Sequence, residues 1–157
     1  MYKKRLALVA HDHKKKDLIE WVEFNRDRLS RHKLICTGTT GRMVEEATGI
    51  TVTSLKSGPL GGDQQMGALI AEGKIDMLIF FWDPMQPQPH DVDIKALLRI
   101  SSLYNIPTAC NRSTADFLIS STLFDSAYIP ARESFDDYLN RYGGGTSARQ
   151  NVHENSN

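Results

Sequence analysis

The feature that most constrains this chain is the alternation of short β-type runs with longer helix-type segments. The β-type runs span residues 6–10, 34–36, 50–55, 77–82 and 106–110, of which 6–10 is continuously apolar and 50–55 is rich in β-branched residues. A run without polar interruption is typical of a strand buried on both faces. Helix-type segments follow these runs at 14–31, 41–49, 64–72, 92–104 and 115–121. The pattern predicts an α/β fold, a three-layer α/β/α sandwich with a mostly parallel five-stranded sheet.

Two further elements are expected near the end of the chain, a short edge strand at 127–129 and a helix at 135–142. From Gly143 onwards the sequence is rich in Gly, Ser and Asn without an apolar pattern, so a disordered polar tail is expected over 143–157. Residues 1–142 fit one domain, and a chain of this length buries roughly 70% of its extended surface without disulfides or a structural metal.

The balance of charge argues against nucleic-acid and membrane partners. The chain has 19 basic and 19 acidic residues, so its formal net charge is zero and it has no long-range field for either. The apolar run at 6–10 is too short for a signal peptide or a membrane span. Cys36 and Cys110 are expected to be free thiols, as in a reducing compartment. The sequence therefore predicts a cytoplasmic protein.

Polar residues gather directly after the predicted strands. They occupy residues 11–13, 37–41, 57–63, 83–93 and 111–114. Right-handed crossovers bring the loops that follow parallel strands to one edge of the sheet, where ligands bind. The sequence therefore predicts a single site built from these loops.

Thr37, Gly38, Thr39 and Thr40 lead into a helix and form a candidate phosphate cradle. Glycine lets the backbone approach an anion, and the helix N-terminus adds oriented N–H groups. The pattern matches neither the Walker loop nor the dinucleotide fingerprint, and a simple helix-capping turn is the alternative interpretation.

Ser57 and Gly58 offer a second set of donors to the same anion. Lys15 lies one helical turn beyond His11, so its charge can reach the cradle as well. Its neighbours Lys14 and Lys16 leave open the alternative that all three lysines form a solvated start of a helix.

Asp63 begins a helix after two glycines. Its alternative interpretation is a helix N-cap. A carboxylate at a helix N-terminus is stabilised as the anion, which suits a base.

His90 lies in a proline-stiffened loop with Asp91 and Asp93, which suits a rigidly aimed electrophile, although a lone loop histidine is often only a surface residue. The histidines, aspartates and isolated cysteines have no metal-ligand spacing, so no metal is expected. No nucleophile elbow is present.

These residues lie in segments that are similar to those of the methylglyoxal synthase family, and the resemblance covers about residues 5–142. The family-like segments are 7–13, 37–41, 57–65, 67–76, 80–84, 89–99, 105–107 and 114–116. Val92 departs from the pattern, since many members carry proline there.

The resemblance implies a flavodoxin-like fold and a lyase without a cofactor. Its reaction would convert dihydroxyacetone phosphate to methylglyoxal and inorganic phosphate, in a homohexamer inhibited by inorganic phosphate. The resemblance assigns Asp63 as the catalytic base, with His90 and Asp93 assisting proton movements. It also implies that the substrate is bound by His11, Lys15, Thr37, Gly38, Thr39, Thr40, Ser57 and Gly58.

Two alternatives share the fold or the chemistry. A non-catalytic, anion-sensing regulatory domain, as in carbamoyl phosphate synthetases, would have no need of a base at Asp63 with His90 and Asp93. An isomerase or aldolase acting on the same triose phosphate would share the enolisation step, and product analysis separates it.

Overall fold

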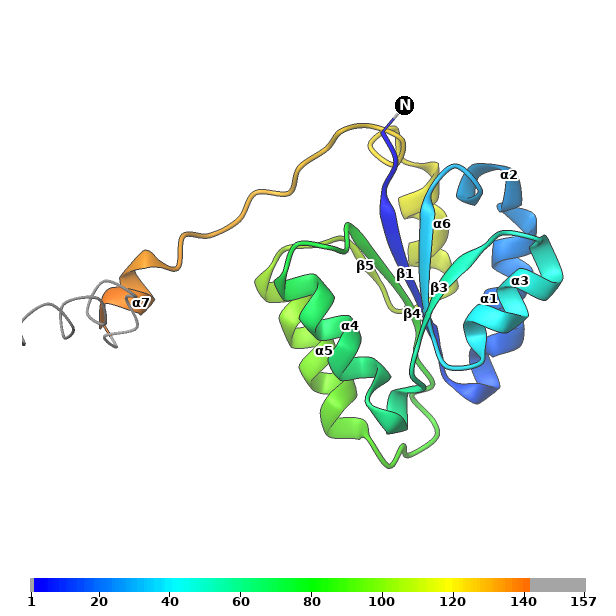
Figure 1. Cartoon of the computed structure of the whole chain (residues 1–157), viewed down its shortest axis with the longest axis horizontal. Helices are drawn as coiled ribbons and strands as arrows, with labels where there is room; N and C mark the ends of the chain where they lie inside the picture. The colour runs from blue at the N-terminus through cyan, green and yellow to red at the C-terminus, as the bar shows by residue number, and fades with distance from the viewer. Residues whose placement is uncertain (1, 142–157) are drawn as a thin grey trace, which may run out of the picture.

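Five parallel strands form the central layer of the protein (Figure 1). The computed structural model describes residues 2–141. The strands are β1 (Arg5–Ala10), β2 (Lys33–Thr37), β3 (Val52–Leu55), β4 (Met77–Phe81) and β5 (Thr108–Ala109). They lie in the order β3-β2-β1-β4-β5, and every neighbouring pair is parallel. The predicted flavodoxin-like three-layer α/β/α class is confirmed.

Helices cover both faces of this sheet. They are α1 (Lys15–Phe24), α2 (Arg26–Leu29), α3 (Thr40–Thr48), α4 (Gly62–Ala71), α5 (Asp91–Leu103), α6 (Arg112–Ser120) and α7 (Asp136–Arg141), with 3-10 turns at η1 (Asp12–Lys14) and η2 (Gly58–Leu60). Helices α1, α3 and α6 pack on one face, and α4 and α5 pack on the other (Figure 1).

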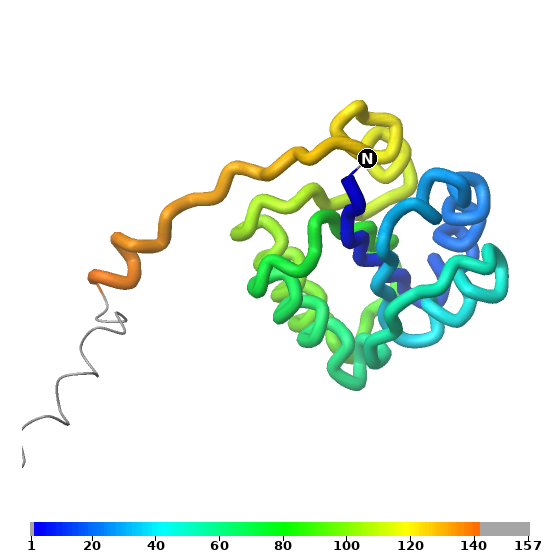
Figure 2. Tube along the Cα trace, turned by 45° about the horizontal axis from the view of Figure 1, so that its top comes forward, coloured from blue at the N-terminus to red at the C-terminus, as the bar shows by residue number. Residues whose placement is uncertain are grey.

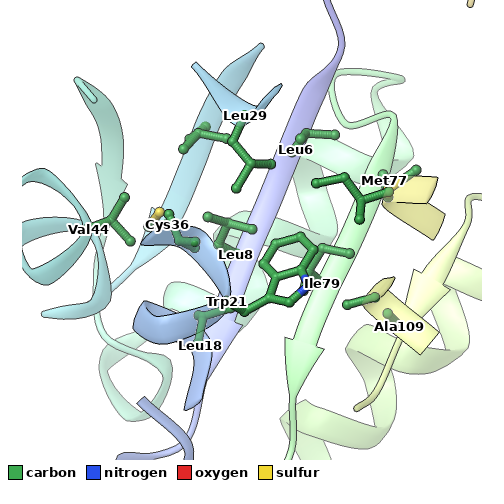
Figure 3. Close-up of a cluster of buried hydrophobic side chains, with 14 of the residues drawn as sticks. Leu6, Leu8, Leu18, Trp21, Leu29, Cys36, Val44, Met77, Ile79 and Ala109 are labelled. Carbon is green, nitrogen blue, oxygen red and sulfur yellow. The ribbon is translucent and has the colours of Figure 1, made fainter. Parts of the chain in front are cut away.

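Two apolar cores follow from the alternation of side chains along the buried strands. Leu6 and Leu8 of β1 point into the core that contains α1, while Ala7 and Val9 point into the core that contains α4 and α5. Trp21 of α1 is at the centre of the first core (Figure 3), and its Nε1 donates to Asp116 of α6 over 2.9 Å. Both faces of β1 are therefore fixed by packing.

The strand order creates a switch point between β1 and β4. From β1 the chain moves to β2 and β3 through α1 and α3 on one face, and it reaches β4 and β5 through α4 and α5 on the other. The loops after β1 and β4 consequently diverge, which opens a crevice at the carboxyl edge of the sheet.

Two expected elements differ from the prediction. The helix expected at 14–31 breaks at Asn25, whose side-chain amide donates to the carbonyl of Trp21 over 2.8 Å and competes with the helical ladder. The edge strand expected at 127–129 is wrong, because Tyr128 lies with Lys4 and Pro107 at the amino end of the sheet rather than along an edge.

The end of the described chain, from about residue 127 to α7, runs away from the sheet (Figure 2). Residue 142, the expected end of the domain, and the tail expected at 143–157 lie outside the described residues. Within residues 2–141, no helix has the length and apolar character needed to cross a membrane. Cys36 and Cys110 are free, as predicted.

Candidate active site

A cavity of about 220 Å³ opens at the switch point, at the carboxyl edge of the sheet. It is lined by residues from the ends of β1, β2 and β3, from the start of α4 and from the loop that precedes α5. The predicted site residues in its lining are His11, Lys15, Thr37, Gly38, Thr40, Ser57, Gly58, Asp63 and His90. Thr39 and Asp93 lie outside the lining.

Four buried side-chain atoms of residues 2–141 have no hydrogen-bond partner, and all four belong to residues that line this cavity. They are Nε2 of His11, Oγ1 of Thr40, Oδ2 of Asp63 and Nδ1 of His90. An unpaired buried polar atom costs about 1–3 kcal/mol, so most such atoms in proteins are paired. Their concentration in one cavity indicates a site for a polar ligand.

One end of the cavity has the character of an anion site. Thr37 ends β2, Gly38 turns the chain at a φ of 55°, and α3 begins at Thr40. The first amides of α3 have no acceptor within the helix, so they are available to an anion. A side chain at position 38 would meet Ser57 at 3.1 Å, so the turn also requires glycine for space.

Lys15 adds a positive charge to this end of the cavity. Its Nζ donates to Oδ1 of Asp12 and to Oγ1 of Thr39, each over 2.8 Å. Thr39 therefore contacts the lysine that lines the cavity although it lines no part itself. Lys14 and Lys16 are absent from the lining, so geometry selects Lys15 among the three lysines.

At the other end, Oδ2 of Asp63 lies 3.4 Å from Nε2 of His90, and both residues are buried. Gly58 lies against this pair, since a Cβ at that position would come within 2.8 Å of Nε2 and 3.2 Å of Oδ2. The glycine therefore leaves open the space in which a ligand can contact both side chains.

The N-cap interpretation of Asp63 is wrong. Gly61 precedes α4, and Asp63 is the second residue of the helix, without a capping hydrogen bond. Burial raises the pKa of Asp63 from its ordinary value, His90 opposes this effect and Asp93 adds to it. The helix N-terminus was expected to favour the anion, but loss of solvent has the larger effect. A carboxylate with a raised pKa is a stronger base when ionised.

His11 is held by the main chain of a distant residue. Its Nδ1 accepts the N–H of Asp83 over 3.0 Å, and its ring lies perpendicular to that of His90 with centroids 5.9 Å apart. Burial, followed by the proximity of His90, lowers the pKa of His11. Both effects favour the neutral ring.

Asp93 acts on the site from the first turn of α5. Its N–H donates to the carbonyl of His90 over 2.9 Å, and its charge raises the pKa of Asp63. It is close enough to influence the base but lines no part of the cavity.

Sequence reasoning did not single out Gln88, Pro59 or Asp12, which also line the cavity. Gln88 lies two residues before His90 in the proline-rich loop, and that nearness was the only available signal. Among residues 2–141 there is no group of three or more His, Cys, Asp or Glu side chains that could hold a metal ion.

Comparisons with known proteins agree on one family. A family model described as "MGS-like domain" matches residues 17–110. The chain is 59% identical to a methylglyoxal synthase of Hahella chejuensis, over 87% of this chain and 88% of the relative. It is 61% identical to a methylglyoxal synthase of Yersinia enterocolitica, over 87% and 90%. The crystal structure of methylglyoxal synthase from Elizabethkingia anophelis superposes with a TM-score of 0.83 at 51% identity, covering 87% of this chain and 90% of that one.

Proposed function

The chain belongs to the methylglyoxal synthase family, and we propose that it converts dihydroxyacetone phosphate to methylglyoxal and inorganic phosphate in the cavity at the switch point. The observation that carries this assignment to particular residues is the pairing of Asp63 with His90 at one end of a cavity whose other end is built for an anion. It is a carbon–oxygen lyase.

The reaction begins with enolisation. Asp63 removes a proton from the hydroxymethyl carbon, and His90 donates a hydrogen bond to the neighbouring carbonyl oxygen. Negative charge develops on that oxygen in the transition state, where a fixed donor in a buried site has its largest effect. The distance of 3.4 Å between Oδ2 and Nε2 supports this division of roles, since the two atoms are near each other without a short mutual hydrogen bond.

Elimination of phosphate follows. The ene-diolate loses its hydroxyl proton as the bond between carbon and the ester oxygen breaks, and the electron pair leaves with the phosphate. The enolate of methylglyoxal remains and takes up a proton on its terminal carbon. We assign Asp93 to the movement of hydroxyl protons, on the strength of its proximity to Asp63.

The orientation of the phosphate decides between elimination and isomerisation. The ester bond must stand out of the plane of the ene-diolate if it is to overlap with the π system. We assign this task to Lys15, to residues 37–40, and to Ser57 and Gly58. The amides at the start of α3 and the lysine support this assignment, because both stabilise the leaving dianion.

The proposal also includes a homohexamer and inhibition by inorganic phosphate, which the family resemblance implies, and residues 1–142 as the catalytic domain. A cytoplasmic location is proposed from the composition of the sequence. Light scattering of the purified protein, with and without phosphate, tests the assembly.

The decisive experiment is product analysis with the purified full chain. Incubation with dihydroxyacetone phosphate is expected to release methylglyoxal and free phosphate in equal amounts. Formation of glyceraldehyde 3-phosphate would assign an isomerase instead. Intact substrate, together with binding of phosphate, would assign the anion-sensing domain, which the names of the relatives do not favour.

A further inference from the structure

Asp83 has a buried carboxylate for which the proposed reaction provides no use. It follows the last residue of β4, Phe81, by two positions, at the switch point where β1 and β4 diverge. Its side chain is 7% exposed and lines no part of the cavity. A buried carboxylate is costly unless other groups compensate it, so its partners indicate what it does.

The main-chain N–H of Asp83 makes the next contact after the hydrogen-bond ladder between β1 and β4 ends. The N–H of His11 donates to the carbonyl of Phe81 over 3.3 Å, which is the last main-chain contact of the pair. The next available N–H, that of Asp83, donates to Nδ1 of His11 over 3.0 Å. This contact requires an unprotonated Nδ1, so the proton of the neutral ring lies on Nε2.

The carboxylate of Asp83 holds this main-chain turn in place. Its Oδ1 accepts the N–H of Met85 over 3.0 Å, which is the local contact of an Asx turn. Its Oδ2 lies 3.4 Å from Nδ1 of His13. Both oxygens are thus engaged outside the cavity, and both contacts fix the direction of the N–H that reaches His11.

We propose that Asp83 is a positioning residue, which holds its own N–H against Nδ1 of His11 and so presents that ring to the substrate as a neutral Nε2–H donor. This inference rests on the proposed function. His11 lines the cavity, and its Nε2 is buried without a hydrogen-bond partner among the described residues. A ligand atom is therefore the partner that the geometry provides for.

The position of β1 in the sheet indicates which ligand atom this is. β1 lies between β2, which leads to the anion site, and β4, which leads to His90. The donor at the end of β1 therefore faces the ester oxygen that joins the phosphate to carbon. As that bond breaks, the electron pair passes to the ester oxygen, and the Nε2–H stabilises the growing charge while the imidazole keeps its proton.

The groups around His11 favour the neutral ring. Burial has the largest effect and lowers its pKa, and His90 acts in the same direction. Asp83, Asp91 and Asp12 act in the opposite direction without overcoming the two lowering effects.

The first test needs no substrate and no change of Asp83. Nitrogen-15 NMR of the imidazoles in the resting full chain, with His11 assigned by its loss in His11→Asn, reports the tautomer directly. The expected result near neutral pH is an unprotonated Nδ1 and a protonated Nε2. A ring protonated on both nitrogens, or a proton on Nδ1, would overturn the proposal.

The second test compares two variants of Asp83. Asp83→Ala removes the acceptor for Met85, and we expect mixed tautomers of His11 with kcat/KM lower by about 10-fold, the scale of one positioned hydrogen bond. Asp83→Asn keeps an acceptor oxygen, and we expect the wild-type tautomer with most of the activity restored. An equal loss of kcat/KM in both variants would show that the charge of Asp83, and not its positioning of His11, supports the reaction, and would overturn the proposal.

Asp91→Asn is the matched control, because Asp91 acts on His11 through its charge, while its Oδ1 accepts the N–H of Gln88 rather than a group in the turn at Asp83. It should leave the tautomer unchanged, and a shifted tautomer would contradict positioning through Asp83. The NMR result also separates this inference from the proposed function. If the protein forms no methylglyoxal while Nε2 carries the proton, the function is wrong and the placement of the proton stands.

Discussion

Asp63 and His90 come within 3.4 Å of each other across a position where the chain has no side chain, at Gly58. The three residues come from the turn after β3, the first turn of α4 and the residue before α5. The space that glycine leaves is thus as much a part of the site as the two polar groups.

Gly58→Ala tests this space. A methyl group there would come within 2.8 Å of Nε2 of His90 and 3.3 Å of both carboxylate oxygens of Asp63, so the pair must shift. We expect kcat/KM to fall on the order of 10²-fold, as for small misplacements of reacting groups. Steady-state kinetics measures this change.

Gly67→Ala in the middle of α4 is the matched control. Its added methyl would have its nearest neighbour at 3.8 Å, an ordinary contact. Activity should be unchanged and the free energy of unfolding higher by about 0.5–1 kcal/mol. Equal activity of the two alanine variants would contradict the crowding argument.

Asp63→Asn removes the proposed base while keeping the shape of the side chain. We expect kcat to fall on the order of 10²–10⁴-fold, the contribution typical of general acid–base catalysis. Release of methylglyoxal and phosphate measures it. Asp17→Asn, in the first turn of α1, changes an acidic residue outside the cavity and should retain full activity. Normal turnover of Asp63→Asn would remove Asp63 from its assigned role.

The same variant should be more stable than the wild type at neutral pH. The folded pKa of Asp63 lies above its ordinary value of 3.8, so the folded state binds more protons than the unfolded state between those two values. Stability from this group is therefore present at low pH and is lost as the pH rises through the folded pKa. Thermal unfolding should show a gain for Asp63→Asn at pH 7 that disappears below pH 3.8. A lower melting temperature at pH 7 would contradict the raised pKa.

Lys15→Ala should weaken binding of both substrate and inorganic phosphate by about 10-fold or more, the effect of losing a charge-assisted hydrogen bond. Calorimetric titration with phosphate measures it without turnover. Lys16→Ala removes an exposed lysine next to it, outside the cavity, and should bind phosphate normally. Identical affinities of the two variants would discredit the anion site.

His32 should make the fold sensitive to acid. It is buried, its Nδ1 accepts the N–H of Lys4 over 3.1 Å, and its Nε2 contacts Asp125 at the same distance. Burial lowers the pKa of His32 below its ordinary value of 6.5 despite Asp125. The folded state thus binds fewer protons than the unfolded state, and stability falls as the pH falls through 6.5 toward the folded pKa.

Urea unfolding between pH 7 and pH 5 measures this dependence. In His32→Asn, which cannot titrate but keeps an acceptor for Lys4, the slope should be smaller. An unchanged slope in His32→Asn would assign the acid sensitivity to another group.

The sequence was informative wherever a local pattern had a physical cause. Apolar runs identified the buried strands β1, β2 and β4, and β-branched residues identified β3. Polar residues after those runs identified the loops that the parallel sheet brings together. The turn at 37–40, which we propose binds phosphate, was predicted from its glycine and from the start of a helix, and the structure has both. These features depend on residues that are close in the chain.

The features that the sequence did not predict depend on contacts between segments that are far apart in the chain. The contact of Asp83 with His11 joins residues 72 positions apart, and the crowding at Gly58 exists only because α4 and α5 converge on it. The wrong prediction of a strand at 127–129 has the same origin. A β-type composition cannot reveal that this segment does not lie beside an edge strand of the sheet. Local sequence patterns therefore predicted the helices and strands, while contacts between distant segments determined which residues form the site.

The unpaired polar atoms of the cavity link ligand binding to the stability of the protein. Unfolding hydrates all four of them, so keeping them buried without partners costs the folded protein part of its free energy of folding. A phosphorylated metabolite that satisfies them shifts the equilibrium back toward the native state. Binding of the proposed triose phosphate substrate is therefore expected to protect the protein from heat and proteolysis as well.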